Sequence, residues 1–411
     1  MQLRTLLPII IFLTGLCAQA QTTAPAMRNW QDQQGRTVKA ALVRVEAENV
    51  ILQLENGTTS TVPLSRFSAA DQAFARQQGA QPPGDPAAVA AASTKKLEWP
   101  PIVSVNKQEL QITNGEQNAA NRQYIYQSGS FQFVSQAPLT GTVMREIASD
   151  FELTRVLFQQ LPWGWEPKPR NGKPLFLAKL FETEEDFIAG GGIENSSGGS
   201  KEDYIFTKFA SLGLKKVGER YAFDAKLAEG GDMIALITRL IMGDMRSLCT
   251  PWASIGMEQL LEHVAYRNGS FVFTAPDRAL KERLDYRRKG GYATDIDRLI
   301  TRLKGGRSSG ATTALRIQTN MDDLLLFYYF GFLDDDGKGA RLHHYFSTVS
   351  QDSLSYRRFN EAGRKGVRLS WKGTFAEHAA ELNNKIIIAD RPDEKLRELI
   401  VAKYKSIGIK L

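Results

Sequence analysis

Apolar and polar residues alternate along the first part of the chain. The alternation is clear in three short runs, at 38–45, 50–54 and 59–62. A period of two is typical of strands with one buried face, and Asn56-Gly57 between the last two runs is a strong hairpin signal. Ser68, with Asp71 three positions later, predicts the capped start of a short closing helix that reaches about Gln77. Four or five short strands and one helix predict a small all-β barrel over 26–78.

Both composition and pattern change after this first part. Residues 79–97 are rich in Ala, Pro, Gly and Gln, and they predict a linker. Beyond it come short runs typical of strands, at 131–134 and 175–181, and a long helix predicted at 139–161. From Asp232 onward apolar residues recur at helical spacing, and further helices are predicted at 252–266, 277–288, 295–303, 315–333, 339–350 and from 393. Strands first and helices after predict an α+β domain over 98–411.

The first twenty residues have the pattern of a secretory signal peptide. Arg4 precedes an apolar run at 6–16, and small residues lead to Ala20, after which cleavage is expected. Cys17 as a lipidated residue is a weaker alternative, because Leu16 is the wrong size just before it. The run is short for a membrane span, and no later run is long enough. We therefore expect an exported protein, periplasmic or extracellular, without a transmembrane segment in the mature chain.

The charge balance adds little to this picture. A net charge of +7 favours an anionic partner, such as an envelope polymer, only weakly. The densest basic region comprises Arg287, Arg288, Lys289, Arg298, Arg302, Lys304 and Arg307, and an exposed helical face is its ordinary explanation. Without interleaved aromatic residues in an exported chain, we expect no nucleic-acid partner. Cys249 is the one cysteine left after signal removal, so no intrachain disulfide is expected.

The first part of the chain resembles a known module. The matching residues are Arg28-Asn-Trp30, Gly35, Ala41-Leu42-Val43, Asn56-Gly57, Val62-Pro63-Leu64 and the stretch from Phe67 to Phe74. Together they resemble the first Sla homology domain, an SH3-like barrel of endocytic adaptors that also occurs in secreted bacterial proteins. The resemblance implies a barrel that binds a peptide or protein. Trp30, Phe67 and Phe74 are then either peptide-binding or core aromatics, and a barrel this small must bury most of its aromatic residues.

The second part resembles a peptidase family that has lost its metal ligands. Over 124–350 the order of elements is similar to that of secreted gluzincin-type metallopeptidases, whose H-E-x-x-H helix supplies two zinc ligands and a base. The corresponding helix has Ala235 and Arg239 at the histidine positions and Leu236 at the base position. In the next predicted helix, Ile255 stands at the third ligand position.

This resemblance implies a zincin-like α+β fold without zinc, other cofactors or catalytic residues. The four histidines of the chain, His263, His343, His344 and His378, do not have the H-x-x-x-H spacing. Ala235, Leu236 and Ile255 are expected to fill the former site as core.

Four other motifs have simple explanations. The sequence Asp334–Gly337 lacks the spacing of a calcium loop and is typical of a polar turn. The glycines within 190–199 lack a following Lys-Ser/Thr, so a mobile loop is expected rather than a phosphate site. Cys249 and His263 are a thiol–imidazole pair that nothing in the spacing brings together. His343 and His344 are adjacent, and neighbours on a helix point about 100° apart, which is unsuited to sharing a metal.

The expected function is that of an exported, non-catalytic binding protein. A peptide- or protein-binding barrel would be tethered to a pseudo-metallopeptidase domain, whose cleft still binds an extended chain. Two alternatives remain open. One is an envelope hydrolase that uses acidic residues instead of zinc, drawn from Glu229, Asp232, Glu258 and Glu262. The other is a structural envelope-assembly protein. Two carboxylates converging in an open pocket would favour the enzyme, and an apolar plug at the former site would favour the pseudoenzyme.

Overall fold

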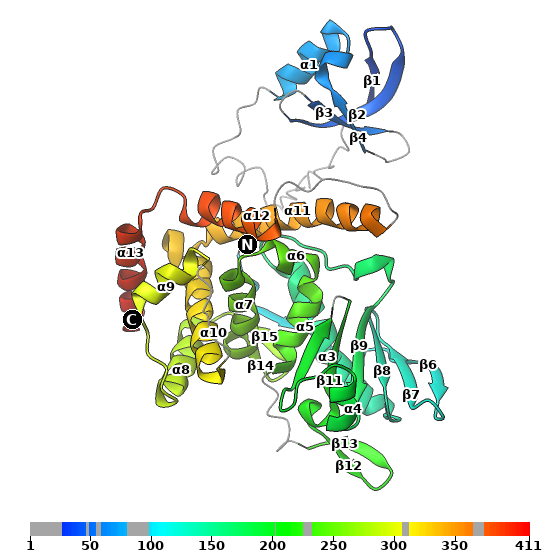
Figure 1. The fold of residues 1–411 in the computed structure, drawn as a ribbon, viewed down its shortest axis with the longest axis vertical. Coiled ribbons are helices and arrows are strands. Elements are labelled where there is room, and N and C mark those ends of the chain that lie inside the picture. Colours follow the sequence, from blue (N-terminus) through cyan, green and yellow to red (C-terminus); the bar gives the residue numbers. More distant parts are fainter. Residues whose placement is uncertain are drawn as a thin grey trace, which may run out of the picture. The chain divides into compact units, whose positions relative to one another are not determined.

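The chain is an α+β protein of two compact units. The structure is a computed structural model, and it describes residues 27–46, 49–54, 59–79, 98–201, 203–224, 232–305, 312–364 and 374–411. One unit extends to Lys95 and the other begins at Lys96 (Figure 1). The predicted signal peptide and all of the predicted linker except Gly79 lie outside the described residues. The two units are described separately below.

The first unit is a four-stranded antiparallel sheet closed by a helix. Its elements are β1 Met27–Gln31, β2 Thr37–Glu46, β3 Asn49–Leu54, β4 Thr59–Pro63, the 3₁₀ turn η1 Leu64–Arg66 and α1 Ala69–Gly79. The strands pair in chain order, and a bulge between Leu42 and Arg44 bends β2. The alternating side chains meet in one small core: Trp30, Ala40, Val50, Leu52, Leu64, Phe67 and Ala75. The strands and the closing helix agree with the sequence prediction.

Asp71 joins the first strand of this unit to the helix. Its carboxylate is 4% exposed, forms an ion pair with Arg28 and accepts the Gln31 amide at 2.7 Å. The Ser68 hydroxyl in turn accepts the Asp71 amide at 3.2 Å, which caps the helix. A buried carboxylate with these partners fixes the position of α1 against the sheet.

We predict that Asp71→Asn destabilises the first unit by about 2 kcal/mol, because it removes a charge-assisted bond at a buried site. Hydrogen exchange of the β2 and β3 amides in the full chain measures this change. The matched control is Asp32→Asn, whose partner Arg36 has a 79% exposed side chain. Exposed pairs of that kind contribute about 1 kcal/mol or less. Equal effects of the two variants would contradict the role assigned to Asp71.

The second unit is built on a six-stranded mixed sheet. Its strands, in spatial order, are β10 Gly198–Lys201, β11 Tyr204–Lys208, β9 Phe176–Phe181, β8 Phe131–Ser135, β7 Gln123–Gln127 and β6 Thr113–Asn118. The three central strands β11, β9 and β8 are parallel, whereas the outer pairings are antiparallel. Strand β10 is therefore an edge strand that pairs on one side only.

Helices cover the two faces of this sheet. Helix α3, Gly141–Gln160, packs the ring of Phe151 on Phe131 and Phe133. Helix α5, Asp232–Met242, packs against α3 and against the edge strand β10. The short α4, Glu184–Ala189, covers the opposite face with Phe187, whose ring meets Phe206. The burial of alternate residues explains this arrangement, since successive side chains of a strand point to opposite faces.

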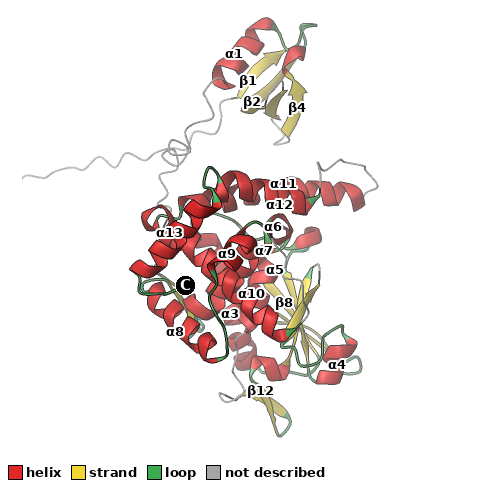
Figure 2. Ribbon diagram, turned by 60° about the vertical axis from the view of Figure 1, so that its left-hand side comes forward, coloured by secondary structure: helices red, strands yellow, loops and turns green. Residues whose placement is uncertain are grey.

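The remainder of the second unit is mainly helical, and Figure 2 shows the six-stranded sheet on one side of these helices. The helices are α6 Asp244–Leu248, α7 Pro251–Leu260, α8 Pro276–Lys289, α9 Ile296–Leu303, α10 Thr313–Tyr328, α11 Ala340–Arg364, α12 Phe375–Leu382 and α13 Asp393–Ser406. Wide turns continue three of them, at η4 Leu261–Ala265, η5 Tyr329–Leu333 and η7 Asn383–Ile388. The other short elements are η2 Arg170–Gly172, η3 Phe209–Leu212, η6 Asp334–Gly337, the hairpin β12 Leu214–Val217 with β13 Arg220–Phe223, and a small sheet of β5 Ile102–Ser104, β14 Tyr266–Arg267 and β15 Ser270–Val272.

Helices α7 and α10 approach each other at Gly256. A Cβ atom at this position would lie 2.4 Å from the Asp323 carbonyl oxygen and 2.6 Å from the Phe327 Cβ. Only glycine permits this approach. The contact fixes the position of α7, which supplies half of the site described next.

Candidate functional site

Helix α5 is buried on all sides except at one residue. From Met233 to Met242 every side chain is buried, apart from that of Arg239. A helix that is apolar all round belongs to the interior. Arg239 is therefore the one charged side chain through which the described part of α5 reaches solvent.

Arg239 forms an ion pair with Glu258 of α7. Its Nη2 lies 2.7 Å from Glu258 Oε2, while Arg246 of α6 places Nε 2.9 Å from Oε1 of the same carboxylate. The Glu258 side chain is 2% exposed, and those of Arg239 and Arg246 are 30% and 38% exposed. We call this arrangement the Arg239–Glu258–Arg246 triad. Both carboxylate oxygens are occupied by guanidinium groups, so Glu258 is unsuited to accept a proton from a substrate.

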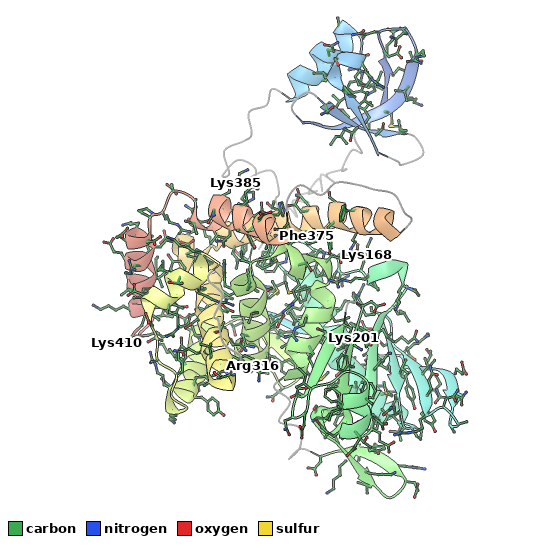
Figure 3. All side chains as sticks on the ribbon, in the orientation of Figure 1. Lys168, Lys201, Arg316, Phe375, Lys385 and Lys410 are labelled. Atoms are coloured by element: carbon green, nitrogen blue, oxygen red, sulfur yellow. The ribbon has the colours of Figure 1, made fainter. Side chains whose placement is uncertain are left out.

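A second carboxylate at the start of α6 is held in the same way. Asp244 is 5% exposed, and its two oxygens lie 2.9 Å from Arg170 Nε and 2.9 Å from Arg357 Nε. Arg357 also donates to the Lys168 carbonyl at 3.2 Å, and Figure 3 shows Lys168 beside the C-terminal half of α11. Since Asp244 and Arg246 lie two residues apart, α6 connects this group to the triad.

Of the residues at the expected zinc-site positions, Ala235 and Leu236 are buried as predicted, whereas Ile255 is not. Ala235 and Leu236 are 7% and 4% exposed and pack as expected. A Cβ at Gly198 of β10 would lie 2.5 Å from Leu236 Cδ1, so Leu236 presses directly on the edge strand. The expectation that Ile255 joins the core is wrong, because it is partly exposed. Glu258, one turn further along α7, is the residue that meets Arg239.

The acids considered for a hydrolase do not form a free pair in the described part of the chain. Glu229 and the side chain of Asp232 lie outside the described residues. Glu262 is 8% exposed, with its carboxylate 3.9 Å from His263 Nε2. Glu258 is bound between two arginines. Among the described residues, neither Glu258 nor Glu262 is thus poised as a general base.

Cys249 and His263 are each in a state unsuited to nucleophilic catalysis. Burial raises the pKa of the Cys249 thiol well above its usual value, so the thiol stays protonated. Burial, together with the nearby cations Arg283 and Arg287, lowers the pKa of His263 to about 3. A base with so low a pKa takes up a proton poorly at neutral pH.

The glycines after α4 serve close packing, and residues 190–197 form a loop, as the sequence predicts. Cβ atoms at Gly190 and Gly192 would lie 2.3 Å from Phe181 and 2.2 Å from Phe187. From Gly198 onward the chain forms strand β10. The absence of side chains lets this segment lie flat on aromatic rings.

We predict that Gly192→Ala destabilises the second unit by about 1–3 kcal/mol, because the added methyl overlaps a buried ring. Gly141→Ala is the matched control, since a Cβ there meets nothing within 4 Å. That control should be neutral or slightly stabilising, because alanine restricts the unfolded chain. Urea unfolding of both variants measures the difference. A neutral Gly192→Ala would show that Phe187 moves aside freely.

Two other sequence features have structural roles. Two of the three acids of the Asp334–Gly337 turn form ion pairs: Asp334 is 2.9 Å from Arg391, and Asp336 is 3.0 Å from Lys403. The ion pairs of the basic region join Arg298 to Asp322, Arg302 to Asp323 and Lys304 to Asp393. Arg307 lies outside the described residues. These carboxylates neutralise much of the charge that suggested an anionic patch there.

In the first unit, two of the three candidate aromatics are core residues. Trp30 and Phe67 are 0% and 3% exposed, and the Trp30 indole donates to the Ala40 carbonyl at 3.2 Å. Phe74 is partly exposed, with the Arg28 guanidinium 3.8 Å above its ring. Of the three, Phe74 is the one within reach of a ligand.

Comparison with known proteins adds no assignment. No family model matches the chain, and no curated protein matches it either. Within the described ranges, no set of three or more His, Cys, Asp or Glu side chains is arranged to hold a metal ion. None of the helices described meets the length and hydropathy needed to cross a membrane.

Proposed function

We propose that this chain is an exported, non-catalytic binding protein that combines an SH3-like barrel with a zincin-like domain. The observation that carries the proposal is the Arg239–Glu258–Arg246 triad. It occupies the junction of α5 and α7, where a zinc peptidase would hold its metal. Ala235 and Leu236 also argue against a metal site, because neither side chain can bind a metal and both are buried.

Several features support a zincin-like arrangement. Helix α5 packs against the antiparallel edge strand β10, against α7 and against the long helix α3. A cleft of this kind binds its ligand as an added strand, through backbone hydrogen bonds along the free edge. Ser200 and Lys201 of β10 are exposed, and Figure 3 labels Lys201. The site would therefore hold an extended peptide without cutting it.

The test places a photo-crosslinking amino acid at Ser200 of the mature chain and incubates it with a pool of random octapeptides. We expect the chain to become crosslinked to intact octapeptides, whether or not zinc is added. The control position is Glu116 on β6, which is the opposite edge of the same sheet and equally exposed. Equal crosslinking at both positions would refute specific binding. Cleaved peptides would refute the non-catalytic assignment.

A further inference from the structure

One face of the six-stranded sheet carries two lysines close to the edge strand β10. The strand pairing places Lys201 of β10 opposite Tyr204 of β11, and Phe206 of β11 opposite Lys179 of β9. Residues directly opposite each other share a face of a sheet, and so do residues two apart on one strand. Lys179, Lys201 and Tyr204 therefore lie on the same face. We call Lys179 and Lys201 the lysine pair.

The lysine pair gathers around the ring of Tyr204. Nζ of Lys179 lies 4.3 Å from the centroid of this ring, and Nζ of Lys201 lies 5.9 Å from it. An aromatic ring attracts an ammonium group without neutralising its charge. Lys201 also donates to the Gly190 carbonyl at 3.2 Å, which uses one of its three N–H groups. Both ammonium groups are thus held near one ring.

Among the described residues, no carboxylate forms an ion pair with either member of the lysine pair. Asp203, two residues after Lys201, lies 2.5 Å from Nζ of Lys173. Lys201 is exposed, and Lys179 and Tyr204 are partly exposed. The described surface beside β10 therefore presents two positive charges, which suits a negatively charged ligand.

A peptide that pairs with β10 would bring one of its residues opposite Lys201. The Cβ atoms of two residues directly opposite each other are about 5 Å apart, and their side chains share a face. The neighbouring peptide residue lies opposite Ser200 and points to the other face, where Leu236 of α5 packs on Gly198. Of two successive peptide residues, only one is therefore within reach of the lysine pair.

We propose that the lysine pair selects an acidic side chain, Asp or Glu, in a peptide that lies along β10. This inference rests on the proposed function and adds the residue type that is recognised. A peptide fits both parts of the surface, because its backbone pairs with the strand edge and its carboxylate meets the ammonium groups. An anionic polysaccharide would engage only the lysines.

The experiment titrates the mature full chain with three synthetic octapeptides that differ only in a central residue, which is Glu, Gln or Lys. The other residues are uncharged, and both ends are blocked, so the central residue carries the only charge. The Glu peptide should bind about fivefold more tightly than the Gln peptide, since a partly exposed ion pair contributes about 1 kcal/mol. The Lys peptide should bind more weakly than the Gln peptide.

A charge reversal tests whether Lys201 makes the selection. Lys201→Glu should bind the Lys peptide more tightly than the Glu peptide and leave Gln-peptide binding unchanged, because backbone pairing is retained. Lys179→Gln should reduce the preference for the Glu peptide without reversing it. Lys410→Glu is the matched control, because it makes the same charge change at another exposed lysine that Figure 3 labels. It should bind all three peptides as the native chain does.

The outcomes separate this inference from the proposed function. Equal binding of the Glu and Gln peptides overturns acid recognition, while non-catalytic peptide binding still stands. Binding of none of the three overturns both. If Lys201→Glu weakens all three equally, Lys201 only supports the edge strand and the inference fails. Lys201→Gln keeps the test decisive if the reversed variant does not fold, because it should abolish the Glu preference and retain Gln-peptide binding. Lys201-dependent binding of dextran sulfate without any preference among the peptides would also overturn it.

Discussion

Replacing Ala235 and Arg239 by histidine should give the second unit a zinc site, with native Glu258 as the third ligand. Residues at i and i+4 share a helix face, so both imidazoles would point the same way. Arg239 Nη2 now lies 2.7 Å from Glu258 Oε2, so a side chain at this position already faces the carboxylate. Histidine is shorter than arginine, so a gap opens between its imidazole and the Glu258 carboxylate. A zinc ion bound about 2 Å from each ligand atom would occupy this gap.

The expected effect is a zinc-dependent rise in stability. At free zinc about 1,000-fold above Kd, binding to the folded state contributes about 4 kcal/mol. Without zinc the double variant should be about 1–3 kcal/mol less stable than the native chain, because Glu258 loses one charged partner. The measurement is the melting temperature with zinc and with a chelator. Leu236 is left in place, so no buried charge is added and no peptidase activity is expected.

Two further variants decide which residue of α7 is the ligand. Adding Glu258→Gln to the double variant should abolish the zinc effect. Adding Ile255→Glu instead should change it little, since Ile255 is partly exposed and Glu258 is the residue in contact with Arg239. Zinc stabilisation that survives Glu258→Gln would contradict the geometry described for α5 and α7.

The sequence predicted elements where the apolar pattern is strong. The alternation in β2, β3 and β4 and the helical period of α3 and α5 gave elements close to those observed. Strand β6, Thr113–Asn118, was missed because its side chains are polar and mostly exposed, so no alternation marks it. Strand β10 was missed for another reason: its glycines resemble a loop, yet they are needed where Phe206 and Leu236 pack closely.

The site shows the same limit at the level of single contacts. The sequence shows Ala235, Leu236 and Arg239 where the family that it resembles has its zinc ligands and base, but it does not show the partner of Arg239. Ile255 and Glu258 lie three residues apart and are neighbours on one helical turn, so spacing alone does not tell which faces α5. A charged residue on an otherwise apolar helix does predict a buried or partly buried partner of opposite sign. Glu258 is an acid of the neighbouring predicted helix and could have been expected to be the partner of Arg239.

Acidification from pH 7.5 to pH 5 should destabilise the second unit through buried His343 and partly buried His263. Burial lowers the pKa of His343 to about 4, and both ring nitrogens are buried without a hydrogen-bond partner among the described residues. Burial and two nearby arginines lower the pKa of His263 to about 3. In the unfolded chain both titrate near pH 6.5, so the unfolded state binds more protons as the pH falls below that value. Stability is therefore retained above pH 6.5 and lost progressively toward pH 4 and pH 3.

The loss at pH 5 should be about 2 kcal/mol for each histidine, since a tenfold difference in proton affinity corresponds to about 1.4 kcal/mol. Urea unfolding of the native chain and of His343→Phe at both pH values measures the share of His343. The variant should lose about 2 kcal/mol less than the native chain over this range. His344→Phe is the matched control, because His344 is the adjacent residue and is exposed. Partial burial and Lys385 also lower the pKa of His344, so a small effect is expected there. If His343→Phe and the native chain lose the same unfolding free energy between pH 7.5 and pH 5, protonation of His343 does not cause the loss. The His343 ring must then have a hydrogen-bonding partner, such as a buried water molecule.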